Sequence, residues 1–264
     1  MEYTDLTVRK DGPIMTVALN RPEALNTLSI RLLRELRQLA LNLRNDPETG
    51  VVILTGGTGM FSAGLDLKDP EVGKMLSGSA SERRERVWLG RAACDALQDA
   101  PQVTIAAVEG FCVGGGVSLA ISCDWRIMSR SAFMHIPEID LGLNYSWGSI
   151  PRLVHLVGPA KAKQMIILAE RIPAEQCALW GLADQVVSDG SALDASISLA
   201  GKVLGKPPMP VAMTKQAINM VFHAHDRSDI HMDADQFMLT TYTEDHREGL
   251  AAFLEKRKPE FKGK

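Results

Sequence analysis

The sequence predicts an α/β protein with a mainly parallel sheet, followed by a helical C-terminal part. Short, continuous apolar runs at residues 51–55 and 103–108 suit strands that are buried on both faces. Helical patterns separate the strand-like runs by several tens of residues, as parallel pairing requires. Beyond about Ala192 only amphipathic helices follow. We therefore expect a core at residues 1–200 and a helical C-terminal module at residues 201–264.

The first elements are predicted to be a hairpin and an amphipathic helix. Residues 4–10 alternate in polarity, residues 14–20 are rich in β-branched and apolar side chains, and the Asp-Gly-Pro turn at residues 11–13 joins them. From the N-cap type residue Ser29, apolar side chains recur at helical spacing as far as Leu43. One face of that helix should lie on the core.

The middle of the chain alternates between strands, turns and helices. Residues 69–86 are polar and charged, which favours a mobile loop and the start of a helix, where substrate-dependent variation is easiest to accommodate. After the run at residues 103–108 we expect a glycine turn and a small helix through Leu119. Two further strand candidates lie at residues 125–128 and 132–136.

Composition and charge exclude several classes of protein. The 264 residues are 45% hydrophobic and 23% charged, and the net charge of −3 comes from mixed signs, so nothing favours nucleic acid or an anionic membrane surface. The N-terminal residues 1–12 lack a targeting pattern, which favours the cytoplasm. The cysteines form no C-x-x-C pair and are expected to be reduced core thiols: Cys94, Cys112, Cys123 and Cys177.

Several familiar active-site motifs are absent from the sequence. There is no G-x-S-x-G, Walker loop, H-E-x-x-H, or G-x-G-x-x-G opening a helix. A covalent hydrolase or an enzyme with a nucleotide cofactor therefore has little support. The apolar stretch at residues 103–123 carries Glu109 and several glycines, so a buried strand, turn and helix explain it better than a membrane span.

Two glycine-rich turns follow the two most apolar strand candidates. They are GGTGMFSAGLDL at residues 56–67 and GFCVGGGVSLAISCD at residues 110–124. Glycine allows close approach of the backbone to a ligand, and a turn that enters a helix leaves N–H donors free. Either turn alone is most simply a reversal of the chain. Together, on neighbouring parallel strands, they favour two N–H groups aimed at one oxygen.

An ordered set of motifs resembles the crotonase (enoyl-CoA hydratase/isomerase) superfamily. The motifs are FSAGLDL, GGGVSLAISCD, HIPEIDLGL and REGLAAFLEKRKPEF, and the opening NRPEALNTLS is similar to that family's N-terminal segment. The resemblance spans nearly the whole chain. It implies an α/β crotonase-like spiral of ββα repeats with a C-terminal helical trimerisation module, and a homotrimer or a hexamer made of two trimers.

The resemblance also implies a catalytic site. It places an oxyanion hole at the backbone N–H groups of Leu65 and Gly115, and a proton-transfer group at Glu138. The apolar neighbours of Glu138 are expected to raise its pKa towards the range useful for proton transfer. Without the resemblance, a single glutamate at a strand end is usually solvated.

The family's coenzyme A contacts fall on two parts of this chain. In the first glycine turn they match Ser62, Ala63, Leu65, Asp66 and Leu67, and near the C-terminus they match Phe253 and Lys256. For Phe253, a core position on an amphipathic helix is an equally good interpretation. Coenzyme A is then part of the substrate, and no separate cofactor is expected.

Ser118 departs from the pattern of the family's two-carboxylate hydratases, which carry a second glutamate at this position. A serine hydroxyl can hold a water molecule but cannot act as a base near neutral pH. An isomerase that uses Glu138 alone and a hydratase-lyase with a Ser118/Glu138 pair therefore stay open. Asp140 is an alternative second carboxylate, because residues two apart share a face in extended backbone.

The acyl pocket is expected from the segment after Glu138 and from the helix before it. The resemblance implies pocket positions at Tyr145, Ser146 and Trp147, and Trp88 is a further candidate that is equally well a core residue. Ser146 stands where some relatives have an aspartate nucleophile, which argues against halide displacement. No metal site is expected, because His223, His225 and His231 are interpreted as surface residues.

The sequence thus predicts an acyl-CoA-processing lyase of the enoyl-CoA hydratase type, acting in the degradation of fatty acids or other acyl-CoA substrates. Its alternatives are a double-bond isomerase and a hydratase-lyase. A non-catalytic CoA-binding or scaffold protein is the alternative of a different class. The intact glycine turns and Glu138 argue against that last interpretation.

Overall fold

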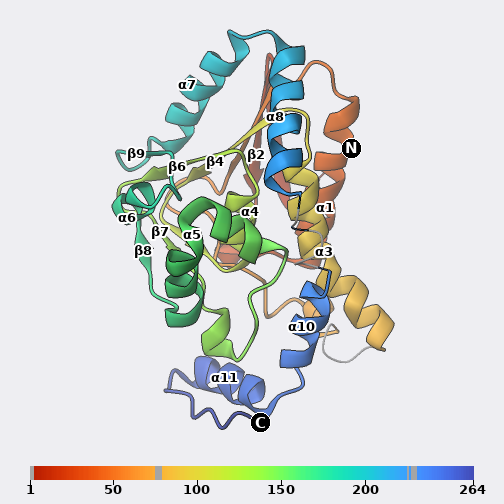
Figure 1. The fold of residues 1–264 in the computed structure, drawn as a ribbon, viewed down its shortest axis with the longest axis vertical. Coiled ribbons are helices and arrows are strands. Elements are labelled where there is room, and N and C mark those ends of the chain that lie inside the picture. The colour runs from red at the N-terminus through yellow and green to blue at the C-terminus, as the bar shows by residue number, and fades with distance from the viewer. Residues whose placement is uncertain (1–2, 75–78, 225, 227–230) are drawn as a thin grey trace.

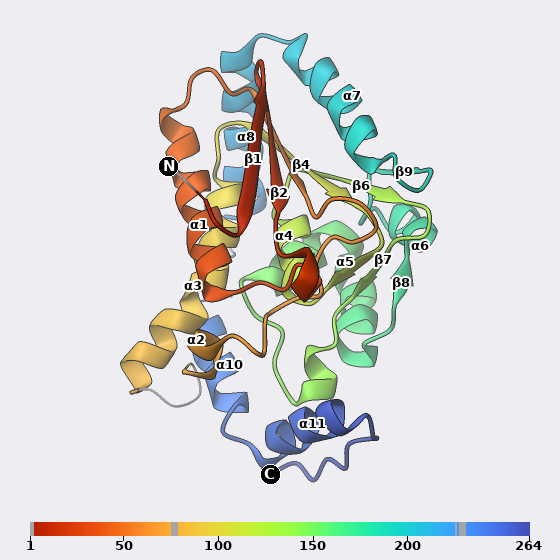
Figure 2. The ribbon, with the colours of Figure 1, turned by 180° about the vertical axis from the view of Figure 1, so that it is seen from behind.

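The computed structural model describes residues 3–74, 79–224, 226 and 231–264. Its centre is a six-stranded sheet in the order β1-β2-β3-β4-β6-β9, accompanied by a three-stranded sheet in the order β5-β7-β8 (Figures 1 and 2). The strands of the large sheet are β1 (Leu6–Asp11), β2 (Ile14–Leu19), β3 (Val51–Thr55), β4 (Val103–Val108), β6 (Trp125–Ser129) and β9 (Gln185–Val187).

The predicted hairpin and the predicted parallel pairing are both confirmed. Strand β1 pairs antiparallel with β2, whereas every later pair in the large sheet is parallel. In the register, Ile53 of β3 lies beside Ile105 of β4. Every residue of these two strands is buried, as their unbroken apolar runs predicted. Their carboxyl ends therefore meet at one edge of the sheet, where the two glycine turns begin.

Two long helices lie side by side along one flank of the large sheet (Figures 1 and 2). Helix α1 (Ile30–Asn42) begins at the predicted N-cap Ser29, whose side chain accepts a hydrogen bond from the backbone of Leu32. Helix α3 (Ala80–Gln98) begins with a capping box at Ser79. The segment at residues 69–86 thus holds the expected helix start and a short helix, α2 (Pro70–Gly73), while residues 75–78 lie outside the described residues.

The smaller sheet corrects part of the prediction for the second glycine turn. Residues expected to be only a turn include strand β5 (Phe111–Val113), which pairs parallel with β7 (Phe133–His135). Three residues are too few to show a strand period, so only the tertiary pairing reveals β5. The third strand, β8 (Ile172–Pro173), was not predicted and pairs with β7.

The remaining helices surround the two sheets. Helix α4 (Gly115–Ile121) follows the second glycine turn and is buried at every residue. Pro207, Pro208 and Pro210 lie at the start of helix α8 (Pro208–Phe222), because proline is compatible with a first turn. The others are α5 (Ser149–Leu168), α6 (Ala174–Leu179), α7 (Ala192–Leu204), α10 (Asp233–Thr240) and α11 (Glu244–Glu255), with short 3-10 turns η1 (Pro22–Ala24), η2 (Leu43–Asn45) and η3 (Glu138–Leu141).

Helix α7 packs on the face of the sheet formed by β3, β4 and β6, where Ala192 and Ala200 join an apolar cluster. The boundary expected between residues 200 and 201 lies inside this helix, and the division into two parts stays a prediction. All four cysteines are buried, and none of them forms a disulfide. No helix in the described ranges is both long and apolar enough to cross a membrane.

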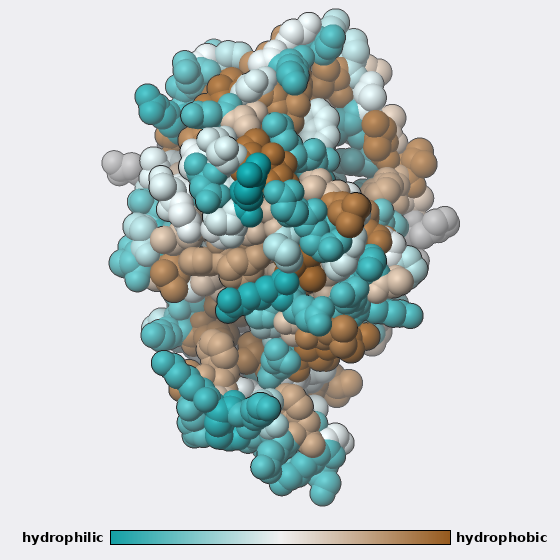
Figure 3. Space-filling model, turned by 90° about the vertical axis from the view of Figure 1, so that its left-hand side faces the viewer, coloured by the Kyte–Doolittle hydropathy of each residue, from teal (hydrophilic) through white to brown (hydrophobic). Residues whose placement is uncertain are grey.

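The surface does not have one uniform character. On the side shown in Figure 3, hydrophilic and hydrophobic residues are interspersed, and hydrophilic residues dominate the end that carries α11. Helix α8, in contrast, carries several strongly exposed apolar side chains. They are Met209, Met213, Ile218, Met220 and Val221, all more than half exposed.

Candidate active site

The two glycine turns approach each other at the carboxyl ends of β3 and β4. Ser62 forms a parallel bridge with Cys112, and the backbone of Val113 donates to the carbonyl of Ser62 at 2.9 Å. A side chain on Gly116 would place its Cβ 3.0 Å from the Cβ of Ser62. Glycine at this position therefore permits the close approach of the second turn to the first.

Two backbone N–H groups at this junction have no acceptor among the described residues. Gly64 has φ +90°, and a Cβ there would lie 3.7 Å from the nitrogen of Gly115. Gly115 is the first residue of α4, so its N–H lacks an acceptor within the helix. The amide of Leu65 is also unused, whereas the amides on either side of it bond to Ser62 and Leu28. The amides of Leu65 and Gly115 are therefore two available donors on adjoining turns.

Glu138 reaches the same turns from the end of β7. The backbone of Gly114 is held by a 2.8 Å hydrogen bond to the carbonyl of His135. Gly114 has φ +51°, and a Cβ there would lie 2.6 Å from Oε1 of Glu138. The carboxyl group of Glu138 therefore lies against the glycine that immediately precedes the Gly115 donor.

One oxygen of the Glu138 carboxyl group is buried and has no partner among the described residues. The residue as a whole is only partly buried, but its Oε2 atom is inaccessible and has no hydrogen-bond partner among the described residues. Removal from water disfavours the charged form and raises the pKa of Glu138 to about 7, although its own backbone N–H acts in the opposite direction. A carboxyl group with this pKa can accept and return a proton near neutral pH.

Ser118 belongs to a chain of three buried hydroxyl groups. Ser149 donates a 2.8 Å hydrogen bond to the hydroxyl of Ser118, which in turn donates a 3.0 Å bond to the hydroxyl of Tyr145. Burial raises the pKa of Tyr145 well above its usual range, and the negative charge of Glu138 adds to this effect. Tyr145 therefore keeps its proton at every pH at which the protein is expected to work.

Trp147 closes the site on the side of α3. Its indole ring lies so close to Gly90 and Gly115 that a Cβ on either glycine would collide with it. Its backbone φ is +64°, and its carbonyl accepts a 3.0 Å hydrogen bond from Arg152. Ser146 is buried beside it. Trp147 thus adjoins the oxyanion candidate Gly115.

Trp88 differs from Trp147, because it is 37% exposed on α3. The guanidinium group of Arg91 lies 4.3 Å from the centre of its ring. Both side chains line a cavity of about 580 Å³ that His231 also borders. Trp88 is therefore a partly exposed residue that lines this cavity. Its assignment to the acyl pocket stays a prediction.

In the first glycine turn, polar side chains are bonded within the protein, whereas several backbone carbonyl groups receive no hydrogen bond from the described residues. Ser62 is fully buried and donates to the carbonyl of Asn26, while Asp66 pairs with Arg21 at 2.7 Å. No described residue donates a hydrogen bond to three backbone carbonyl oxygens of the turn, those of Ala63, Leu65 and Leu67. Three carbonyls at alternate positions leave acceptors for a ligand that carries N–H donors.

The two C-terminal candidates lie on α11 and just beyond it. Phe253 is 61% exposed, which excludes a core position within this chain. Lys256 is the exposed left-handed residue that ends the helix. Helix α11 itself packs on η3, with a 2.8 Å hydrogen bond between His246 and the carbonyl of Leu141. The C-terminal segment is thus attached to the turn that carries Glu138.

Asp140 cannot act as the second carboxylate in the way the sequence suggested. That expectation assumed extended backbone, whereas residues 138–141 form the 3-10 turn η3. In such a turn, side chains two positions apart do not share a face. Asp140 is exposed, while the carboxyl oxygens of Glu138 face the glycine turn.

The interpretation of His223 as a surface residue is wrong. Its side chain is only 17% exposed and its ring is bonded to Asp226. His231 is exposed as expected, and His225 lies outside the described residues.

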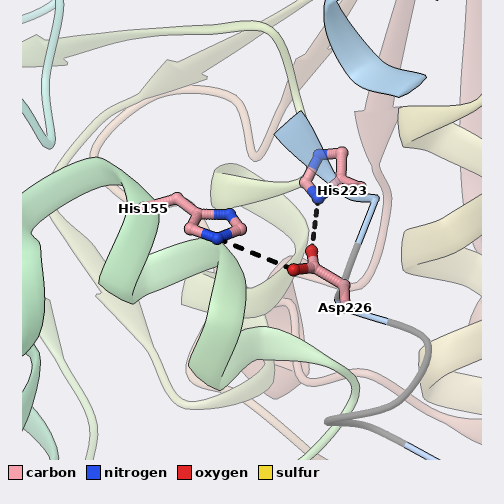
Figure 4. Close-up of side chains that lie close together, drawn as sticks. All are labelled: His155, His223 and Asp226. Carbon is pink, nitrogen blue, oxygen red and sulfur yellow. Dashed lines mark hydrogen bonds and ion pairs between the residues drawn. The ribbon is translucent and has the colours of Figure 1, made fainter. Parts of the chain in front are cut away.

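His223 joins His155 and Asp226 in a group whose candidate ligand atoms all lie within 4.8 Å of one another (Figure 4). The carboxylate of Asp226 lies between the two rings, with one oxygen 3.6 Å from His155 and the other bonded to His223. A shared ion requires all three atoms to point at one centre about 2 Å away. Each oxygen of Asp226 instead faces its own imidazole, so this arrangement is that of two histidine–carboxylate pairs.

Sequence reasoning missed the hydroxyl chain as a unit. Tyr145 was assigned to the acyl pocket, and Ser149 was not singled out at all. Both were hidden because they lie about thirty residues from Ser118. Ser149 meets it where α4 packs against the start of α5, and Tyr145 meets it from the segment between η3 and α5. The one available signal was Ser118 itself, a polar residue within an otherwise apolar segment.

Comparison with known proteins supports the resemblance over the whole chain. A sequence model of the family described as enoyl-CoA hydratase/isomerase matches residues 9–264. The chain is 35% identical to the short-chain-enoyl-CoA hydratase of Clostridium acetobutylicum, over 98% of each chain. It is also 35% identical to the crotonyl-CoA hydratase of Syntrophomonas wolfei, over 99% of each.

Solved structures agree in fold. An enoyl-CoA hydratase from Mycobacterium avium subsp. paratuberculosis superposes with a TM-score of 0.88, at 26% identity, covering 99% of this chain and all of the other. The structure of Pseudomonas aeruginosa OdaA gives a TM-score of 0.85 at 28% identity, covering 95% of this chain and 98% of the other.

Proposed function

The chain belongs to the enoyl-CoA hydratase/isomerase family, and we propose that it is an enoyl-CoA hydratase, a lyase that adds water to the double bond of a 2-enoyl-CoA. The predicted α/β crotonase-like fold is confirmed by the solved structures it matches. The observation that carries the proposal is the buried carboxyl group of Glu138, with a pKa of about 7, beside two unused amides. The names of the relatives support the same reaction.

In the proposed reaction, the thioester oxygen lies between the amides of Leu65 and Gly115. Glu138 takes a proton from a water molecule while the water oxygen bonds to the β-carbon and the double bond shifts to an enolate. Glu138 then returns a proton to the α-carbon, so H and OH are added and the carboxylate is regenerated. Each amide donor in a preorganised site of this kind is worth about 3 kcal/mol.

The proposed recognition of coenzyme A uses backbone and C-terminal groups. The unoccupied carbonyls of Ala63, Leu65 and Leu67 suit the exocyclic amino group of adenine, which is a hydrogen-bond donor. Lys256 would meet the phosphates as a cation, and Phe253 offers an exposed aromatic face. Ser62 and Asp66 shape the turn rather than contact the nucleotide, because their side chains are bonded within the protein. The reaction needs no other cofactor.

We propose that the protein forms a homotrimer, or two stacked trimers, through its C-terminal helices. The support is the apolar face of α8, where Met213 is 62% and Val221 is 81% exposed. Apolar areas of this kind are typical of protein–protein interfaces. A cytoplasmic location and a role in the degradation of fatty acids or other acyl-CoA substrates complete the proposal.

One experiment separates the hydratase from the isomerase and from a non-catalytic binding protein. Purified protein is given a 2-enoyl-CoA and a 3-enoyl-CoA in separate assays at neutral pH. Absorbance of the conjugated 2-enoyl thioester falls on hydration and rises when a 3-enoyl-CoA is isomerised. Consumption of the 2-enoyl-CoA supports the hydratase. Consumption of the 3-enoyl-CoA alone supports the isomerase, which the absence of a carboxylate at Ser118 favours. If neither reacts while CoA still raises the thermal transition, the protein is a binding protein.

A further inference from the structure

The hydroxyl chain at Ser118 ends at Tyr145. The hydroxyl of Ser118 lies 2.8 Å from that of Ser149 and 3.0 Å from that of Tyr145. Outside this chain, the one described acceptor for the proton of Tyr145 is the carbonyl of Gly114 at 3.5 Å, which is at the outer limit of a hydrogen bond. The chain thus ends in a buried hydroxyl group that the serines hold and that has only a weak acceptor beyond them.

Tyr145 and Glu138 present complementary groups around the same glycine. The hydroxyl of Tyr145 approaches the carbonyl of Gly114, and Oε1 of Glu138 lies against the α-carbon of that residue. Glu138 Oε2 is an acceptor with no partner among the described residues, while Tyr145 has only a weak acceptor outside the serine chain. Buried polar groups normally have partners, and a water molecule bonded to both would satisfy each of them.

We propose that Tyr145 is the second catalytic group of this enzyme and takes the place of the missing carboxylate. Its hydroxyl donates a hydrogen bond to the oxygen of the water that is added, while Glu138 accepts a proton from that water. Ser118 holds Tyr145 in position and does not contact the substrate. The inference rests on the proposed hydratase function and adds the group that places the water.

The chemistry of the two groups differs from that of a carboxylate pair. Burial keeps Tyr145 protonated, so it is a fixed donor and never the base. All proton transfer passes through Glu138, and Tyr145 has the same proton before and after the reaction. In the reverse direction the same donor stabilises the hydroxide that leaves the β-carbon, where negative charge develops. A reaction that moves no oxygen does not need Tyr145.

The test compares two reactions of the same site. Hydration of crotonyl-CoA requires a placed water, whereas exchange of the α-protons of butyryl-CoA in D₂O requires only Glu138 and the oxyanion donors. In Tyr145→Phe we expect kcat for hydration to fall about 100-fold, as for loss of one preorganised donor, with KM and the exchange rate nearly unchanged. Tyr242→Phe, which removes a hydroxyl that contacts Arg83 on another part of the chain, is the matched control and should hydrate like wild type.

Each outcome decides between the alternatives. Hydration at the wild-type rate by Tyr145→Phe overturns the inference, and so does a parallel loss of hydration and exchange, which shows a structural role. Ser118→Ala should lower hydration less than Tyr145→Phe does. A larger loss in Ser118→Ala would assign the water to the serine and refute a role for the tyrosine. If the wild-type protein exchanges α-protons but hydrates nothing, the proposed function fails first, and the inference falls with it.

Discussion

Replacement of Glu138 by glutamine tests both the chemistry and the electrostatics of the site. The amide is similar in size but cannot accept and return a proton. General acid–base catalysis is worth about 10²–10⁴-fold, and because one carboxyl group handles both protons here, we expect a loss of about 10⁴-fold in kcat. Binding of CoA should persist, because the amides and carbonyls of the glycine turns are unchanged. Hydration of crotonyl-CoA and thermal stabilisation by CoA measure the two effects separately.

The same substitution should change the pH dependence of stability. Burial raises the pKa of Glu138 from 4.5 to about 7, and at 1.36 kcal/mol for each pKa unit the ionised form costs the folded state about 3 kcal/mol. Because the folded pKa is the higher one, the folded state is favoured below pH 4.5. That advantage is lost as pH rises through 7. The cost is therefore almost fully present at pH 8, whereas only about a quarter of it is present at pH 5.

Glu138→Gln should consequently gain stability relative to wild type between pH 5 and pH 8, by up to about 3 kcal/mol. The cost of burying the amide is the same at both pH values and cancels in this comparison. Denaturant unfolding at the two pH values measures the difference. Asp140→Asn, which neutralises an exposed carboxyl group on the same turn, is the matched control and should leave turnover unchanged. A Glu138→Gln variant with wild-type turnover, or with no pH-dependent gain, would refute the reasoning.

Three further predictions concern the same features. Gly114→Ala should lower kcat at least 100-fold, because the new Cβ would displace the carboxyl group of Glu138 and because a φ of +51° disfavours alanine. Steady-state kinetics measure this loss, and a fully active variant would contradict the placement of Glu138. For hydration, kcat/KM should fall as pH drops below about 7, because Glu138 must be ionised to accept a proton. A pH–rate profile that stays flat from pH 6 to 8 would exclude Glu138 as the base. Val221→Glu should shift the protein towards monomers by placing a charge on the apolar face of α8, which analytical ultracentrifugation detects; an unchanged mass removes this face from the interface.

Much of the fold could be predicted from the sequence, because the local pattern of these segments agrees with their place in the folded structure. The hairpin, the helix after Ser29 and the strands at residues 51–55 and 103–108 all have the period or the continuous apolarity that their final environment requires. Strands β5 and β8 were missed because two or three residues carry no period, and their pairing partners lie far away in the sequence. Tertiary pairing alone defines such elements.

The site was predictable where backbone geometry sets its chemistry and unpredictable where side chains meet by packing. The glycine turns indicated that backbone donors meet here, because glycine is needed for the close approach seen at Gly64 and Gly116, while the resemblance to the family assigned the donors to Leu65 and Gly115. The fallback role of Asp140 failed, since nothing local distinguishes an extended segment from a short 3-10 turn after Pro137. The hydroxyl chain that ends at Tyr145 depends on α4 meeting the start of α5 and the segment before it, which no spacing rule reveals.

The neutral hydroxyl chain has a consequence for Glu138 that a second carboxylate would not allow. Burial alone raises the pKa of Glu138 to about 7, with no opposing or reinforcing charge among its causes. A second carboxylate at the position of Ser118 would add like-charge repulsion, and one of the two groups would then stay protonated at neutral pH. Because Ser118 and Tyr145 are uncharged, the single carboxyl group can be ionised in about half of the molecules near pH 7. A site with one acid is therefore able to both take and return a proton, provided that a neutral donor such as Tyr145 places the water.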